Sequence, residues 1–142
     1  MKKVKSKIVD RTQAPNYYAV ARAFRTSAEA LAELPGQGAT YGNAIALLAI
    51  HAAISYADAL AVAFGGRKSS DDHTRSAELL QNVLKAQVPV EMVKILRVVI
   101  GAKDEVSYQG SYYPLDDGLR LLDKAGRFYS WADELYQRRP PA

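Results

Sequence analysis

The stretch that decides the fold runs from Tyr41 to Phe64 and reads "YGNAIALLAIHAAISYADALAVAF". Apolar residues, many of them alanine, occupy it nearly all round a helical wheel, and the pair Gly65–Gly66 closes it. A helix that is apolar on every side is typical of the centre of a bundle, because other elements must cover all of its faces. We therefore predict a buried central helix over Tyr41–Phe64.

Four further helices are predicted around this one from apolar residues that recur at helical spacing. Glycines and prolines, as in "LPGQG" (Leu34–Gly38), fall mostly between them, and no segment alternates with period two for long enough to be a strand. The fold class is therefore all-α, an up-and-down helical bundle of about five helices. The four ranges are Asn16–Leu34, Asp72–Ala86, Val90 to about Lys103, and Leu115–Gln137.

The length of 142 residues fits one domain, predicted over residues 14–137. Residues 1–13 are expected to be a basic flexible tail and residues 138–142 a frayed C-terminus. The absence of cysteine excludes disulfides and favours a cytoplasmic protein. No apolar run follows the basic start, and the longest one, Ala44–Ile50, is short of the ~20 residues that a spanning helix needs. No membrane association is expected.

The net charge of +4 is concentrated in the first residues. From Ile8 onward, 15 basic residues balance 15 acidic ones, so the predicted domain is neutral. Nucleic-acid binding would therefore have to come from a local patch and not from bulk charge. The four lysines that precede Ile8 are Lys2, Lys3, Lys5 and Lys7.

A stripe of polar residues marks the otherwise apolar central helix. His51, Ser55 and Asp58 are spaced i, i+4 and i+7 and share one face, with Asn43 about two turns earlier. A buried polar group without a partner costs ~1–3 kcal/mol, so such a stripe needs partners. Two interpretations stay open, an internal hydrogen-bond ladder and a face toward a cleft or a subunit interface.

Arg67 and His73 lie on either side of the turn after this helix. A guanidinium suits phosphate oxygens, and an imidazole can carry a proton near neutrality. The pair suits a phosphodiester, with Asp58 near enough to orient one of them. The spacing alone is unspecific, because solvated loop charge beside an exposed histidine gives the same pattern. One histidine also cannot be base and acid in the same step, whereas a two-fold dimer supplies two.

A tyrosine-rich loop precedes the last helix in "SYQGSYYP", residues Ser107–Pro114. Tyr108, Tyr112 and Tyr113 could stack on nucleic-acid bases, at ~1–3 kcal/mol each. The alternative is that they cover the end of the bundle and form dimer contacts, since tyrosine is common at interfaces.

Two segments resemble the HEPN family (higher eukaryotes and prokaryotes nucleotide-binding). The segment "AISYADALAVAFGGRKSSDDHTRSAELL", Ala53–Leu80, is similar to that family's second and third helices. The family shows a small-residue helix, a short basic turn and a histidine that opens the next helix. The segment "KDEVSYQGSYYPLDDGLRLLDKAGRFYSWADELY", Lys103–Tyr136, is similar to its final part. The resemblance spans roughly residues 41–136.

The resemblance implies a HEPN-like bundle, usually a homodimer, and in many members a metal-independent endoribonuclease. It assigns Arg67 and His73 to the catalytic site, with Asp58 as the upstream acidic residue and the polar residue Lys68 beside the arginine. It implies no cofactor. Many members are toxins neutralised by a nucleotidyltransferase antitoxin, whereas others are non-catalytic dimerisation modules that bind a nucleotide or a partner protein. His51, Ser55 and the three tyrosines complete the candidate binding residues.

Overall fold

The computed structural model describes residues 5–36, 38, 40–70, 73–107, 110 and 112–142. Helices dominate these residues, and the prediction of an all-α helical bundle is confirmed. Five helices have nine residues or more, and α5 is a short addition. Their bounds are α1 Ala14–Glu33, α2 Thr40–Gly65, α3 Ser76–Leu84, α4 Val90–Gly101, α5 Lys103–Ser107 and α6 Leu115–Gln137.

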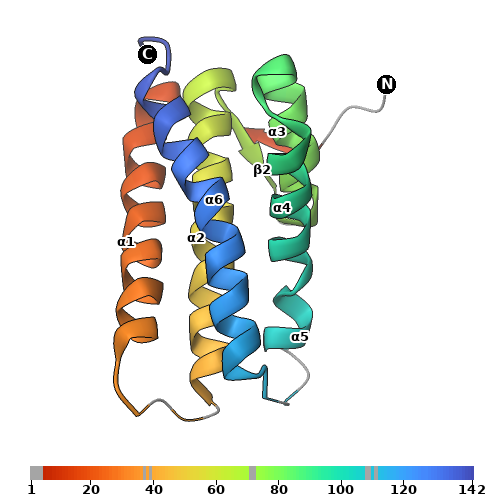
Figure 1. Ribbon diagram of the computed structural model, residues 1–142. Coiled ribbons are helices and arrows are strands. Elements are labelled where there is room, and N and C mark those ends of the chain that lie inside the picture. Colours follow the sequence, from red (N-terminus) through yellow and green to blue (C-terminus); the bar gives the residue numbers. More distant parts are fainter. Residues whose placement is uncertain (1–4, 37, 39, 71–72, 108–109, 111) are drawn as a thin grey trace.

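Helix α2 is the central element of the bundle (Figure 1). Helices α1 and α6 both pack along it but have few contacts with each other, while α3, α4 and α5 cover its remaining side. Helices α1 and α2 run in opposite directions, as do α4 and α6 (Figure 1). This arrangement explains why α2 is apolar nearly all round, because neighbours cover several of its faces.

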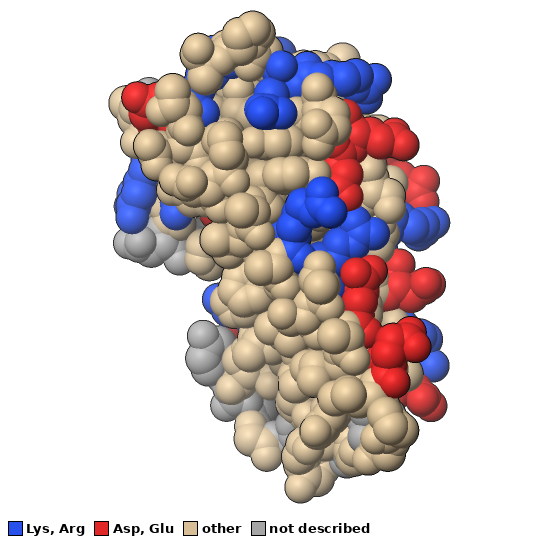
Figure 2. All heavy atoms as spheres, turned by 90° about the vertical axis from the view of Figure 1, so that its left-hand side faces the viewer, with Lys and Arg blue, Asp and Glu red and all other residues tan. Residues whose placement is uncertain are grey.

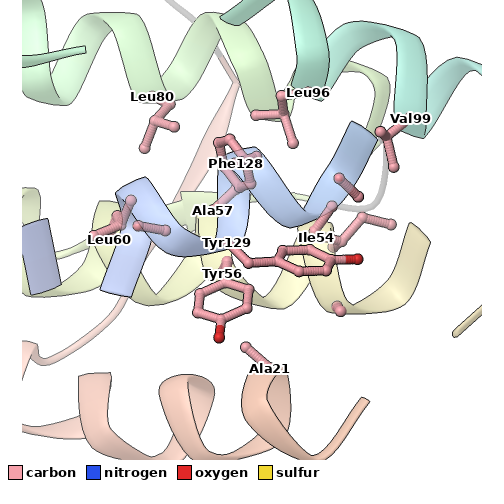
Figure 3. Close-up of a cluster of buried hydrophobic side chains, with 14 of the residues drawn as sticks. Ala21, Ile54, Tyr56, Ala57, Leu60, Leu80, Leu96, Val99, Phe128 and Tyr129 are labelled. Carbon is pink, nitrogen blue, oxygen red and sulfur yellow. The ribbon is translucent and has the colours of Figure 1, made fainter. Parts of the chain in front are cut away.

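Alanines on α2 let the neighbouring helices approach closely. Sixteen α2 residues are buried, and eight of them are alanine. Larger side chains from α3, α4 and α6 fill the space over these alanines (Figure 3). The residues that Figure 3 shows in this role are Leu80, Leu96, Val99, Phe128 and Tyr129.

The structure adds a two-stranded antiparallel ribbon that the sequence analysis did not predict. It pairs β1 (Ser6–Ile8) with β2 (Arg67–Ser69), with Lys7 opposite Lys68. Residues 6–13 therefore differ from the expected loose tail, because they form β1 and the 3₁₀ helix η1, Arg11–Gln13. Lys2 and Lys3 lie outside the described residues.

Arg11 connects the start of the domain to its end. Its Nε donates to the carbonyl oxygen of Ala63, and its terminal nitrogen donates to the carbonyl oxygens of Pro140 and Pro141 at 3.0 and 2.9 Å. The C-terminal residues, expected to be frayed, are thus hydrogen-bonded to η1. α6 itself ends at Gln137, as predicted.

By length and composition, α2 is the one helix in the described ranges that could cross a membrane. Its most apolar stretch is 78% buried inside the bundle, as in the core helix of a soluble protein.

Candidate functional site at the β2 turn

Arg67 is the first residue of β2, and the N-terminal strand holds it from the side. Its Nε donates a hydrogen bond to Ser6 Oγ at 2.9 Å, and both residues are partly buried. The preceding Gly66 has a φ of +64°, a conformation that favours glycine, and its carbonyl oxygen accepts from Val9 N–H at 2.9 Å. β1 and Gly66 therefore fix the direction in which Arg67 leaves α2.

Lys68 follows as the second cation of β2. Its Nζ lies 5.3 Å from the centre of the Tyr17 ring on α1, a geometry in which the ring attracts the ammonium group. Lys68 is partly buried, like Arg67. The turn therefore presents two adjacent cations, one held by Ser6 and the other placed over Tyr17.

Asp58 lies beneath this turn and is 6% exposed. Burial raises its pKa to about 6, while the charge of Lys68 and hydrogen bonds from Ser69 oppose the rise. Ser69 Oγ donates to Asp58 Oδ1 at 3.4 Å, and Ser76 Oγ donates to Ser69 Oγ at 3.2 Å. This buried chain joins α2, β2 and α3. The structure thus places Asp58 against Lys68 and Ser69, the two residues that follow Arg67.

His73 lies four residues after the end of β2. The predicted helix starts at Asp72 with His73 in its first turn. In the structure His73 begins the 3₁₀ helix η2, His73–Arg75, and α3 starts only at Ser76. His73 is half-buried, and its Nδ1 is shielded from solvent. Asp71 and Asp72, between β2 and His73, lie outside the described residues.

The hydrogen bonds of Asn43 agree with the internal-ladder interpretation of the polar stripe. Its amide nitrogen donates to the carbonyl oxygen of Val106 at 3.0 Å, and its Oδ1 accepts from Tyr113 N–H at 3.0 Å. This side chain therefore joins α2 to α5 and to the segment before α6.

His51 and Ser55 remain half-buried on α2. The His51 ring lies 5.5 Å from that of Phe24, centre to centre. Burial lowers the pKa of His51, and the charge of Lys103 lowers it further. This part of the stripe is thus partly open to solvent, whereas Asp58 at its end is closed off.

The tyrosine loop lies at the opposite end of α2 from Arg67. Tyr112 is 70% exposed and Tyr113 is half-buried, while Tyr108 lies outside the described residues. Asn43, which holds Tyr113, precedes the end of α2 by about 30 Å at 1.5 Å per residue. Within one chain, the structure therefore does not bring Tyr112 and Tyr113 to the β2 turn.

Four residues at this turn were missed from the sequence: Ser6, Tyr17, Ser69 and Ser76. The hydroxyl of Ser69 bonds Asp58. Ser6 is brought to Arg67 by a strand pairing across some 60 positions, for which the only signal was the short alternation in "KSKI".

No three acidic or histidine side chains come together as a metal site among the residues that the structure describes. Comparison of the chain with models of protein families, with curated proteins and with solved structures found no match.

Proposed function

We propose that this protein is a HEPN-type endoribonuclease whose active site is built on the β2 turn and completed by a second copy of the chain. Arg67 binds the phosphoryl oxygens of single-stranded RNA, and His73 is the proton carrier. Lys68 adds a second positive charge beside the phosphate. Asp58 acts through Ser69 as a positioning residue for β2.

The proposed reaction is an attack by the ribose 2′ oxygen on the adjacent phosphorus. The new 2′ O–P bond forms as the bond from phosphorus to the 5′ oxygen breaks, leaving a 2′,3′-cyclic phosphate and a 5′ hydroxyl. A neutral His73 accepts the 2′ proton, and the protonated His73 of a second copy gives a proton to the leaving 5′ oxygen. The two imidazoles must lie on opposite sides of the phosphate, which is why two chains are required. Arg67 stabilises the charge that develops on the phosphoryl oxygens.

One observation supports this proposal above the others: Arg67 and Lys68 are consecutive residues of a short strand, and each has its own anchor. β1 holds Arg67 through Ser6, and the buried Asp58–Ser69–Ser76 chain holds the strand from below. Preorganised cations stabilise developing charge without having to reorganise during the reaction. A solvated loop would not need such anchors.

The burial of His73 favours a second candidate function. A histidine that is half-buried with Nδ1 shielded from solvent is also what a structural residue looks like. In that case the protein is a non-catalytic HEPN module that binds a nucleotide or a partner protein through the same basic turn.

Cleavage of a fluorescently labelled single-stranded RNA in the presence of EDTA tests the proposal. We expect wild-type protein to cut it to a 2′,3′-cyclic phosphate, detected by mass spectrometry. His73→Ala and Arg67→Ala should each lower the rate by at least ~100-fold, the usual size of a general acid–base or charge-stabilising contribution.

Arg75→Ala is the matched control, because Arg75 lies in the same 3₁₀ helix, is exposed and pairs with Glu78 at 3.0 Å. It should cut like wild type, and thermal melting should show that all variants are folded. RNA left intact by folded wild-type protein, or equal cleavage by His73→Ala, would remove the nuclease. If wild-type protein then binds a nucleotide and Arg67→Ala does not, the non-catalytic module is supported.

A further inference from the structure

A groove runs between α1 and α6, far along the bundle from the β2 turn. Both helices pack on α2, and their direct contact lies elsewhere, where Tyr18 and Arg25 of α1 meet Asp133 of α6. The volume of the groove is 290 Å³. Glu29 and Ala32 of α1 line it on one side, and Leu119, Leu122, Asp123 and Gly126 of α6 on the other.

Gly126 is the middle residue of α6, where a glycine weakens a helix by roughly 1 kcal/mol relative to alanine. Three other helical glycines have a steric reason within the chain, whereas Gly101, the last residue of α4, has none. A Cβ at Gly42 or Gly118 would meet backbone atoms at 2.0 and 2.7 Å, and one at Gly65 would meet Val83 at 2.8 Å. A Cβ at Gly126 would meet nothing within 4 Å. The described chain therefore gives no steric reason for glycine at either position, but Gly126, unlike Gly101, lines a groove.

The charge on the groove is acidic. The Glu29 side chain is 54% exposed and lies 3.5 Å from Arg25, whereas Asp123 is exposed and has no ion-pair partner within the described ranges. On the α1 side of the molecule, acidic side chains lie along one edge, with lysines or arginines between them (Figure 2). Leu119 and Leu122 add an apolar floor between these carboxylates. An occupant that fits must therefore combine positive charge with apolar side chains.

We infer that this groove is a docking site for a basic amphipathic helix of a partner protein, which crosses α6 closely at Gly126. Apolar side chains at helical spacing fill the groove over Leu119 and Leu122, and lysines or arginines on either side meet Glu29 and Asp123. The groove is shallow and open, at the lower limit of volume for small-molecule pockets. A helix laid along it covers more of its length than a small molecule would. The inference is independent of the nuclease proposal, since it uses none of the residues of the β2 turn.

The test uses a synthetic alanine-rich helical peptide with leucines along one face and lysines beside them, and a twin in which every lysine is glutamate. Fluorescence anisotropy should show saturable binding of the lysine peptide to wild-type protein, and no binding of its twin. Amide chemical shifts should change on α1 and α6 around Gly126.

Gly126→Gln fills the groove with a neutral helix-forming side chain and should weaken binding at least tenfold. Gly101→Gln is the matched control, because a Cβ at Gly101 also meets nothing within 4 Å, and it should bind like wild type. Gly126→Ala should raise the Tm by a few degrees, which shows that the position accepts a side chain. Asp123→Asn should weaken binding less than Gly126→Gln does.

Equal binding of the two peptides, or undiminished binding by folded Gly126→Gln, would overturn the inference. Sedimentation that shows wild-type protein self-associating, with Gly126→Gln abolishing it, would also overturn it. The occupant would then be a second copy of this chain.

Discussion

At the scale of single residues, Asp58 carries a buried carboxyl group whose hydrogen bonds come from Ser69. Burial raises its pKa from 3.8 to about 6, so the folded protein binds this proton more tightly than the unfolded chain does. The resulting stabilisation is complete below the ordinary pKa and is lost as the pH rises through about 6.

Replacing this carboxyl should remove that dependence on pH. Between pH 8 and pH 5, the free energy of unfolding of wild-type protein should rise by about 1 kcal/mol more than that of Asp58→Asn, which keeps an acceptor for Ser69. Urea unfolding at the two pH values measures this difference. Glu134→Gln, at an exposed position on α6, should follow wild type. Parallel pH profiles for wild type and Asp58→Asn would contradict the burial of a titrating carboxyl group.

The sequence predicted those residues of the site whose side-chain charge already indicates a role. Arg67, Lys68 and Asp58 do meet at one end of the bundle, because the glycine pair ends α2 and a short strand follows. Ser6 and Ser76 could not be found, because a serine shows its role only once its partner is known. Tyr112 and Tyr113 could stack on bases, as predicted, but they lie at the other end of the bundle from the β2 turn. The sequence does not say which end of a bundle a loop covers.

At the scale of elements, α2 and α6 cross at a point where both carry glycine. A Cβ at Gly118 would lie 2.7 Å from the backbone oxygen of Gly42 and 3.1 Å from its Cα. Backbone atoms cannot move aside as the end of a flexible side chain can. The contact therefore depends on the absence of a side chain at Gly118, whereas a Cβ at Gly42 would meet the backbone of Tyr113 and Pro114.

Gly118→Ala should therefore destabilise the protein although alanine is the better helix former. Overpacking typically costs 1–3 kcal/mol, which outweighs the ~1 kcal/mol that alanine gains in helix propensity. Urea unfolding should show a loss of about 1–2 kcal/mol. Gly101→Ala, where a Cβ meets nothing within 4 Å, should be neutral or stabilising. An unchanged or increased stability of Gly118→Ala would show that the two helices are not in this close contact.

The long helices could be predicted because burial repeats along them many times. Leu115–Gln137 has the predicted bounds, and α1 and α2 differ from theirs by one or two residues. The three-residue strands could not be predicted, because three residues are too few to show the alternation of apolar and polar side chains that marks a strand. α3 starts four residues later than predicted, because the 3₁₀ helix η2 precedes it.

Asp133 is a charged residue on the side of α6 that is otherwise apolar. In the structure its carboxylate accepts hydrogen bonds from two donors on α1. Tyr18 donates to Oδ1 and Arg25 to Oδ2, each at 2.8 Å. The Tyr18 ring also stacks on Tyr136 of α6, with ring centres 3.8 Å apart. This contact joins α1 to α6, both of which pack on α2.

At the scale of the whole molecule, the charge balance limits how the proposed nuclease holds RNA. Beyond the first lysines, 15 basic and 15 acidic residues cancel, so the domain has no bulk attraction for a polyanion. Affinity must come from the cations at the β2 turn and from their duplication in a second copy. Two copies of Arg67 and Lys68 would neutralise about four phosphates, which implies a modest dependence on salt.

Subunit mixing tests whether the active site of the proposed nuclease needs His73 from two chains. If each cut uses the His73 of one copy as base and that of the other as acid, a mixed dimer with one His73→Ala chain is inactive. After equal amounts of wild type and His73→Ala exchange subunits at random, cleavage should fall to about a quarter of the unmixed wild-type rate, because only the homodimers of wild type remain active. Independent sites would leave about half of that rate under the same dimer statistics. Arg75→Ala mixed in the same way should leave the rate unchanged, since Arg75 is exposed and paired within its own chain. A value near one half would show that one chain carries a complete site, and the acid for the 5′ oxygen would then have to come from a group other than a second His73.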